Sequence, residues 1–237
     1  MRRATTLRTL RPLAVALVAL GLDPTVALAR PKPSDVERFF TLAADGAVPA
    51  DPFLANGVAV GAATATYTAA GTGPSAVNTL APNGSAARYI DYELITQLFP
   101  DFAPTDDDKA KGVLPGTMTL TEAQGLNCMA RVQENLAAAG LTLEDVTFMR
   151  IYLDNVEGEP RADYNGWNRA YRKYMANVSL QTGEVIEAYA PVLFENATRP
   201  ARSNIEVGTL PVAGWLIEIE VVAAYPRKER SWWLFRP

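Results

Sequence analysis

The 237-residue sequence contains no histidine. Histidine is the side chain whose charge changes nearest neutral pH, and it is a frequent general base and the most common protein ligand for transition metals. Its absence excludes every catalytic arrangement that pairs a serine or a cysteine with a histidine. Any catalysis by this chain must therefore use carboxylates, arginine, lysine, tyrosine, bound water or backbone amides.

Cysteine and long apolar runs are also scarce. The single cysteine, Cys128, excludes an internal disulfide even in an oxidising compartment, and its place on a predicted helix favours an inert thiol over a nucleophile. Beyond the N-terminal segment, no apolar run is long enough to cross a membrane. Apolar residues still make up 49% of the chain, which is enough to form a sizeable core.

The N-terminal segment resembles a secretory signal peptide. Four arginines precede the apolar run 12–22, which is too short to span a bilayer, and Ala27-Leu28-Ala29 has the small-x-small pattern of a cleavage site. We predict cleavage after Ala29 and a periplasmic or secreted mature protein, with an uncleaved N-terminal anchor as the alternative.

Cleavage would remove four arginines and one aspartate, changing the net charge from −4 to −7. Nucleic-acid binding needs clustered lysine and arginine, so an acidic mature chain argues against nucleic acid as the main partner. No membrane association is expected once the signal is removed.

Residues 30–225 are predicted to form a single α+β domain with insertions at about 73–116 and 178–197, followed by an aromatic and basic tail over 226–237. The tail favours packing on the body or on a neighbouring subunit over a membrane-surface patch. Asp106, Asp107 and Asp108 indicate a solvated turn rather than a calcium loop, because the glycine and glutamate of such a loop are missing. The expected helices are 34–44, a segment near 89–99, 121–140 and 159–177, and the expected strands are two within 56–71, one within 143–155 and two within 198–225.

The helix over 121–140 carries the clearest boundary signals. Thr121 and Gln124 have the spacing of a capping box, and Gly140 is placed to end the helix. The strand within 143–155 has no plainly polar face, so we expect both of its faces to be covered.

Residues 198–225 are predicted to form a β-hairpin with charged side chains on the face opposite its apolar one. Alternation places Arg202 with Asn204 and Glu206, and it places Glu218 with Glu220. Two interpretations remain open. Arg202 and Glu218 could form a cross-strand ion pair, or they could line a cleft between subunits. In such a cleft the guanidinium would bind a carboxylate and the glutamate would activate water.

Four segments of the sequence carry a family resemblance: "RPARSNIEV", "PVAGWLIEIEVVA", "AAAGLTLEDVTFMRIYLDN" and "YNGWNRAYRKYM". The first two are similar to the C-terminal signature, and the last two to the central segments, of the Rid family of reactive-intermediate deaminases, also called YjgF or L-PSP proteins. The segment "NGVAVGAATATYTAAGTGP" resembles its opening strands more loosely. Together these segments cover about residues 52–72 and 117–225.

The resemblance implies a chorismate-mutase-like mixed sheet of about six strands with two helices on one face. It also implies a homotrimer with small-molecule clefts between subunits, and hydrolysis of 2-imino and enamine acids to 2-keto acids and ammonia without a cofactor or a metal. Carried over by motif, Arg202 holds the substrate carboxylate, Glu218 positions the attacking water, and Asn168 lines the site.

The sequence departs from the family pattern at three other candidate site positions. Ala70 stands before Gly71 where a small hydroxyl residue is usual, Asn204 stands where cysteine is frequent, and Phe53 replaces a frequent tyrosine. Each lost hydrogen bond to a charged group would weaken binding by roughly 1.5–3 kcal/mol. A non-catalytic trimer that binds small carboxylates is therefore the alternative function, and an endoribonuclease is the least favoured.

Overall fold

The computed structural model describes residues 36–226, and the predicted signal peptide and nearly all of the C-terminal tail lie outside this range. Within this range, six strands form two sheets. Strands β1 (Val36–Phe39) and β2 (Gly57–Val60) pair antiparallel in a small sheet. Strands β3 (Thr66–Thr68), β6 (Ile217–Ala224), β4 (Val146–Leu153) and β5 (Ala201–Glu206) form the larger sheet in the order β3-β6-β4-β5. The fold is thus the expected α+β type with a mixed sheet, although the six strands do not belong to one sheet.

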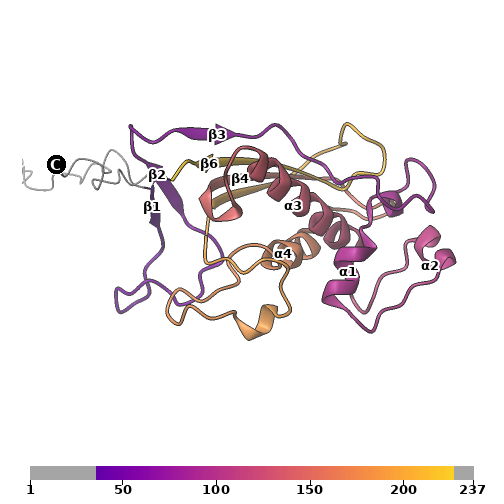
Figure 1. Ribbon diagram of the computed structural model, residues 1–237, viewed down its shortest axis with the longest axis horizontal. Coiled ribbons are helices and arrows are strands. Elements are labelled where there is room, and N and C mark those ends of the chain that lie inside the picture. Colours follow the sequence, from indigo (N-terminus) through magenta and orange to yellow (C-terminus); the bar gives the residue numbers. More distant parts are fainter. Residues whose placement is uncertain (1–35, 227–237) are drawn as a thin grey trace, which may run out of the picture. The chain divides into compact units, whose positions relative to one another are not determined.

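Two helices, α3 (Leu120–Ala138) and α4 (Tyr164–Arg172), pack together beside the larger sheet (Figure 1). The approach is close at Gly125 of α3, where an added Cβ would lie 2.8 Å from the Cβ of Ala170. The side chains between helices and sheet are fully buried: Leu126, Met129, Leu136, Met149, Ile151, Trp167, Ile217 and Ile219. Within the segment predicted as a helix over 159–177, Trp167, Ala170, Tyr171 and Tyr174 are buried, whereas Tyr164 is only partly buried.

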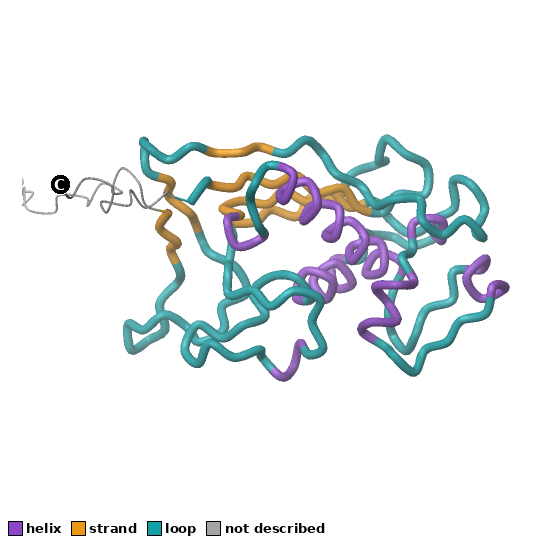
Figure 2. Tube along the Cα trace, viewed as in Figure 1, coloured by secondary structure: helices purple, strands orange, loops and turns teal. Residues whose placement is uncertain are grey.

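The first predicted insertion is folded onto α3. It contains α1 (Tyr92–Leu98), α2 (Asp106–Lys111) and the 3₁₀ turn η1 (Ala86–Tyr89), joined by long loops (Figure 2). Two buried amides of α3 hold these loops. Gln124 donates to the carbonyl oxygens of Ala86 and Gly214 at 3.0 and 2.8 Å, and Asn127 donates to those of Ser75 and Tyr89 at 2.9 Å each. The polar side of α3 is therefore an internal surface that organises the insertion.

Three local predictions were wrong. Residues 36–39 form strand β1 instead of part of a helix, because they pair with β2. The aspartate run is not a turn, since it opens α2, where Thr105 and Asp108 form a capping box. The cap of α3 is Thr119, whose hydroxyl accepts from the backbone N–H of Glu122, whereas Thr121 is buried inside the first turn.

The predicted hairpin over 198–225 was also wrong. Strand β4 lies between β5 and β6, pairing parallel with β5 and antiparallel with β6. Residues 207–216 connect the two strands across the end of β4. This arrangement excludes one of the two open interpretations, a cross-strand ion pair between Arg202 and Glu218, because β5 and β6 are not neighbours in the sheet.

The described residues fully cover only one face of strand β4. Thr147, Met149, Ile151 and Leu153 are buried, whereas Phe148, Arg150 and Tyr152 are half-buried on the other face. A further turn, η2 (Leu143–Asp145), leads into β4, and η3 (Glu187–Tyr189) lies in the second insertion. Among residues 36–226, no helix is long and apolar enough to cross a bilayer.

Candidate functional site

Arg202 lies on edge strand β5 and extends over the face of the sheet that the helices cover. It stands opposite Met149 of β4, which is fully buried against the helices. Its Nη2 donates to Oδ1 of Asn168 on α4 at 2.8 Å. Asp163 caps this helix by accepting from the backbone N–H of Gly166 at 2.8 Å. The strand register and the capped helix thus bring together two residues that the motifs predicted to share a site.

Aromatic rings surround the Arg202 guanidinium. Its Cζ lies 4.6 Å from the ring centroid of Phe53, 4.5 Å from that of Tyr171 and 5.8 Å from that of Trp167. Such stacking stabilises a cation electrostatically. Burial lowers the pKa of Arg202 to about 10, so the side chain remains charged at neutral pH. Its Nη1 is enclosed and has no hydrogen-bond partner among the described residues.

Asn204 forms a hydrogen bond with one of the aromatic residues that contact Arg202. Its Oδ1 accepts from Nε1 of Trp167 at 3.2 Å, so the amide holds an indole that itself contacts the Arg202 guanidinium. The residue was predicted to bind substrate. In the structure its oxygen helps to orient the aromatic surroundings of Arg202.

Glu218 lies on the opposite face of the sheet. It is paired with Tyr152 of β4, whereas Arg202 is paired with Met149, and residues 149 and 152 point to opposite faces. Glu220, on the same face as Glu218, accepts from Nη1 of Arg150 at 3.0 Å. Burial, and then the charge of Glu220, raise the pKa of Glu218. Within one chain, Arg202 and Glu218 therefore cannot contact the same small molecule.

The Gly71 backbone lies directly against the Glu218 side chain. Thr72 and Ile219 exchange backbone hydrogen bonds of 2.9 and 2.8 Å, which holds Gly71 next to β6. A Cβ built on Gly71 would lie 1.7 Å from Oε1 of Glu218, so only glycine leaves room for the carboxylate in this position. Ala70 is exposed beside it. The predicted site residues thus form two groups, one with Arg202, Asn168 and Phe53, and one with Glu218, Ala70 and Gly71.

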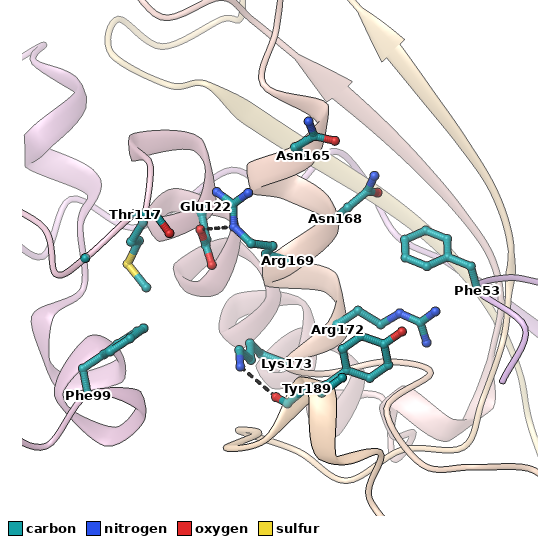
Figure 3. A pocket seen from close by; sticks show the side chains of 13 residues that line it. Phe53, Phe99, Thr117, Glu122, Asn165, Asn168, Arg169, Arg172, Lys173 and Tyr189 are labelled. Atoms are coloured by element: carbon teal, nitrogen blue, oxygen red, sulfur yellow. Dashed lines mark hydrogen bonds and ion pairs between the residues drawn. The ribbon is translucent and has the colours of Figure 1, made fainter.

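A cleft of about 760 Å³ adjoins the first group (Figure 3). Phe53 and Asn168 line it on the side of Arg202. Phe99 and Gly116 contribute from the first insertion, and Tyr189 contributes from the second. Both predicted insertions therefore extend the surroundings of the Arg202 group.

The charged residues of the cleft were missed by the sequence analysis. They are Arg169, Arg172 and Lys173 of the α4 segment, together with Glu122 of α3. The signal was present in "NRAYRK", where three cations recur at helical spacing next to Asn168. Among the described residues, no group of three or more histidine, cysteine, aspartate or glutamate side chains is placed to hold a metal ion.

Comparison with protein families supplies the identification. The family model described as endoribonuclease L-PSP matches residues 107–225. The chain belongs to this family. The L-PSP match runs from α2 to the end of β6 and so contains Arg202, Asn168, Asn204 and Glu218. Phe53, Ala70 and Gly71 lie before it.

Solved structures of the same family resemble the chain. A Rid-family protein of unknown function from Yersinia pestis is 22% identical, with a TM-score of 0.40, and the match covers 79% of this chain and 98% of that one. A YjgF-family member from Mycobacterium tuberculosis is 18% identical, with a TM-score of 0.35 and coverage of 81% and 100%. Another from Neisseria meningitidis is 17% identical, with a TM-score of 0.35 and coverage of 83% and 98%. Comparison with curated protein sequences found no match.

Proposed function

We propose that the protein hydrolyses 2-imino and enamine acids to 2-keto acids and ammonia. The observation that carries this proposal is the environment of the Arg202 guanidinium. Its guanidinium is oriented by Asn168, stacked against aromatic rings, and free of any ion pair with a described carboxylate. A preorganised guanidinium with an unused donor binds a planar carboxylate well, because its N–H groups match the two carboxylate oxygens.

The second catalytic group is proposed to come from a neighbouring copy of the chain. Arg202 and Glu218 lie on opposite faces of the sheet, so a ring in which one face meets the other would pair them across each interface. A homotrimer of this kind would repeat the site three times. Each cleft would contain Arg202, Asn168 and Phe53 of one copy and Glu218 and Gly71 of the next.

The chemistry requires addition of water to the imine carbon. Glu218 would hold a water molecule and accept a proton as the oxygen forms its bond to that carbon. Nitrogen receives this proton, which gives a tetrahedral intermediate with a hydroxyl and an amino group on the same carbon. The hydroxyl proton then passes to nitrogen as the C=O bond forms and the C–N bond breaks, so that the nitrogen leaves as ammonia. Because the pKa of Glu218 is raised, its carboxylate is a stronger base than an ordinary glutamate. We propose no cofactor for this reaction, and we propose that it takes place in the periplasm or outside the cell.

A trimer that binds carboxylates without turning them over is the alternative function. It is favoured by the engagement of Asn204 with Trp167 and by the replacement of the usual hydroxyl residue with Ala70, since both reduce the polar contacts available to a reacting substrate. An endoribonuclease remains the least favoured function, because the expected mature chain is acidic and has no histidine.

The direct test is hydrolysis of 2-iminopropanoate generated in the assay by an amino-acid oxidase. We expect the wild-type protein to produce pyruvate from the imine faster than protein-free buffer does. If pyruvate forms no faster, but keto acids still raise the melting temperature in a saturable way, the protein is the non-catalytic binder.

Gly71→Ala tests whether the position of the Glu218 carboxylate matters. The new methyl group would overlap Oε1 of Glu218 and displace the end of that flexible side chain. We expect kcat for imine hydrolysis to fall about tenfold or more, with little change in melting temperature, because one misplaced catalytic group costs much rate and little packing. Gly57→Ala is the matched control, since nothing lies near its added Cβ. Equal kcat in wild type and Gly71→Ala would remove Glu218 from the mechanism.

A further inference from the structure

Three arginines lie near Phe53, which lines the cleft, and of the three only Arg172 is itself part of the lining. Arg202 is joined by Arg172, which is 5% exposed, and by Arg199, which is 1% exposed. The Arg172 Cζ lies 4.4 Å from the ring centroids of both Phe53 and Tyr189. Arg172 and Arg202 thus stack on the same phenyl ring, at 4.4 and 4.6 Å.

No described carboxylate forms an ion pair with any of these arginines. The ion pairs of residues 36–226 are elsewhere, between Lys111 and Asp107, Arg150 and Glu220, and Arg169 and Glu122. Arg172 and Arg199 donate to backbone carbonyls, at Ala176 for the first and at Pro52 and Ala197 for the second. The charge of Asp51 raises the pKa of both Arg172 and Arg199, but Asp51 is exposed and forms no ion pair with either arginine.

Each of the three guanidinium groups has one enclosed nitrogen with no hydrogen-bond partner among residues 36–226: Nε of Arg172, Nη2 of Arg199 and Nη1 of Arg202. Unpaired buried donors are costly, and unneutralised buried charges are more so. Burial lowers the pKa of Arg199 and Arg202, and the charge of Arg172 lowers both further. A single bound carboxylate would offset only part of this positive charge.

The residues that line the cleft also carry more positive than negative charge (Figure 3). Arg169 donates to Glu122 at 2.7 Å, which uses the acidic group of the lining. Lys173 donates to the carbonyls of Tyr189 and Pro191 at 2.7 and 2.9 Å, which are neutral partners. Arg172 reaches from α4 toward Phe53, on the side of the cleft where Asn168 also points. The cleft therefore keeps positive charge in a chain whose net charge is negative.

We propose that the ligand of this cleft carries a second anionic group, which Arg172 binds beside the carboxylate held by Arg202. The substrate class is then a 2-imino dicarboxylic acid or an equally compact dianion, and not an imino acid with an aliphatic side chain. The buried charge of Arg199 adds to the electrostatic attraction for the anionic ligand without contacting the ligand. This inference rests on the proposed role of Arg202 for the first carboxylate, but not on turnover. The cleft volume of about 760 Å³ lies within the usual range for small-molecule sites.

The test is a binding measurement by calorimetry on the full-length chain at constant ionic strength. The probes are 2-oxoglutarate, a dicarboxylate, and 2-oxobutyrate, a monocarboxylate. We expect the wild type to bind 2-oxoglutarate at least tenfold more tightly, because a charge-assisted hydrogen bond is worth about one to two orders of magnitude in affinity. Arg172→Met should lose this preference, and Arg161→Met should keep it, since Arg161 is exposed and away from the cleft.

Equal affinity of the wild type for the two probes would overturn the proposal, as would an unchanged preference in Arg172→Met. If Arg172→Met does not fold, Arg172→Lys is the deciding variant. Lysine keeps the positive charge but lacks the two-pronged guanidinium, so this variant should retain only part of the preference for 2-oxoglutarate. The outcome is separable from the proposed function. A protein that prefers the dianion but hydrolyses no imine supports this inference and contradicts the deaminase, and the reverse result contradicts only this inference.

Discussion

Replacing Arg202 with methionine is expected to lower kcat/KM for 2-iminopropanoate hydrolysis about a hundredfold or more. The substrate carboxylate would lose two charge-assisted hydrogen bonds, each worth about 1.5–3 kcal/mol. Methionine fills similar space among Phe53, Tyr171 and Trp167, so the variant should fold and assemble as the wild type does. The measurement is steady-state kinetics, with size-exclusion chromatography to confirm that the oligomer is unchanged.

Arg161→Met is the matched control because it removes an exposed guanidinium that faces Tyr164. We expect its kcat/KM to stay within about twofold of the wild type, since exposed charges away from a site contribute little. Arg202→Lys should recover only a small part of the lost activity, because an ammonium cannot make the two-pronged contact or replace the stacking. Wild-type kinetics in Arg202→Met would exclude this residue as the carboxylate-binding group.

Part of the predicted site is brought together within one chain. The sequence motifs placed Arg202, Asn168 and Phe53 in one site, and the structure brings Asn168 within 2.8 Å and Phe53 within 4.6 Å of the Arg202 side chain. The helix predicted over 159–177 is also present, as the shorter α4 (Tyr164–Arg172). These features depend on local periodicity and on motif residues within helices and strands. A single sequence is enough to detect the periodicity and the motifs.

The sequence could not predict which strands are neighbours. Alternation of polar and apolar residues assigns the two faces of each strand, but it does not say whether consecutive strands pair with each other. Because β4 enters between β5 and β6, Arg202 and Glu218 face opposite sides of the sheet. The strand at 36–39 was missed for a related reason, since its partner β2 lies in a separate part of the chain.

The arginine cluster was missed because its members come from different segments. Arg172 ends α4, Arg199 precedes β5, and Arg202 lies on β5, so no single stretch of sequence contains the whole group. Phe53 and Tyr189, which stack on Arg172, come from further segments again. Only tertiary packing shows that these charges share one enclosed space.

The most direct test of a site shared between two copies is complementation of two inactive variants. Arg202→Met lacks the carboxylate-binding group, and Glu218→Gln lacks the group that would activate water, so each should be nearly inactive alone. In a mixed trimer, an Arg202 from one variant can meet a Glu218 from the other at an intact interface. Each ring that contains both variants has one intact interface in three, so mixed trimers separated from the single-variant rings should have about a third of wild-type activity.

The measurement is the rate of imine hydrolysis by co-expressed, differently tagged variants purified through both tags in succession. Each variant alone, tagged and purified in the same way, supplies the baseline. The account predicts a clear gain in rate for the mixed oligomers over both parents. Mixed oligomers no more active than their parents would contradict it, since Arg202 and Glu218 would then not meet across an interface between copies.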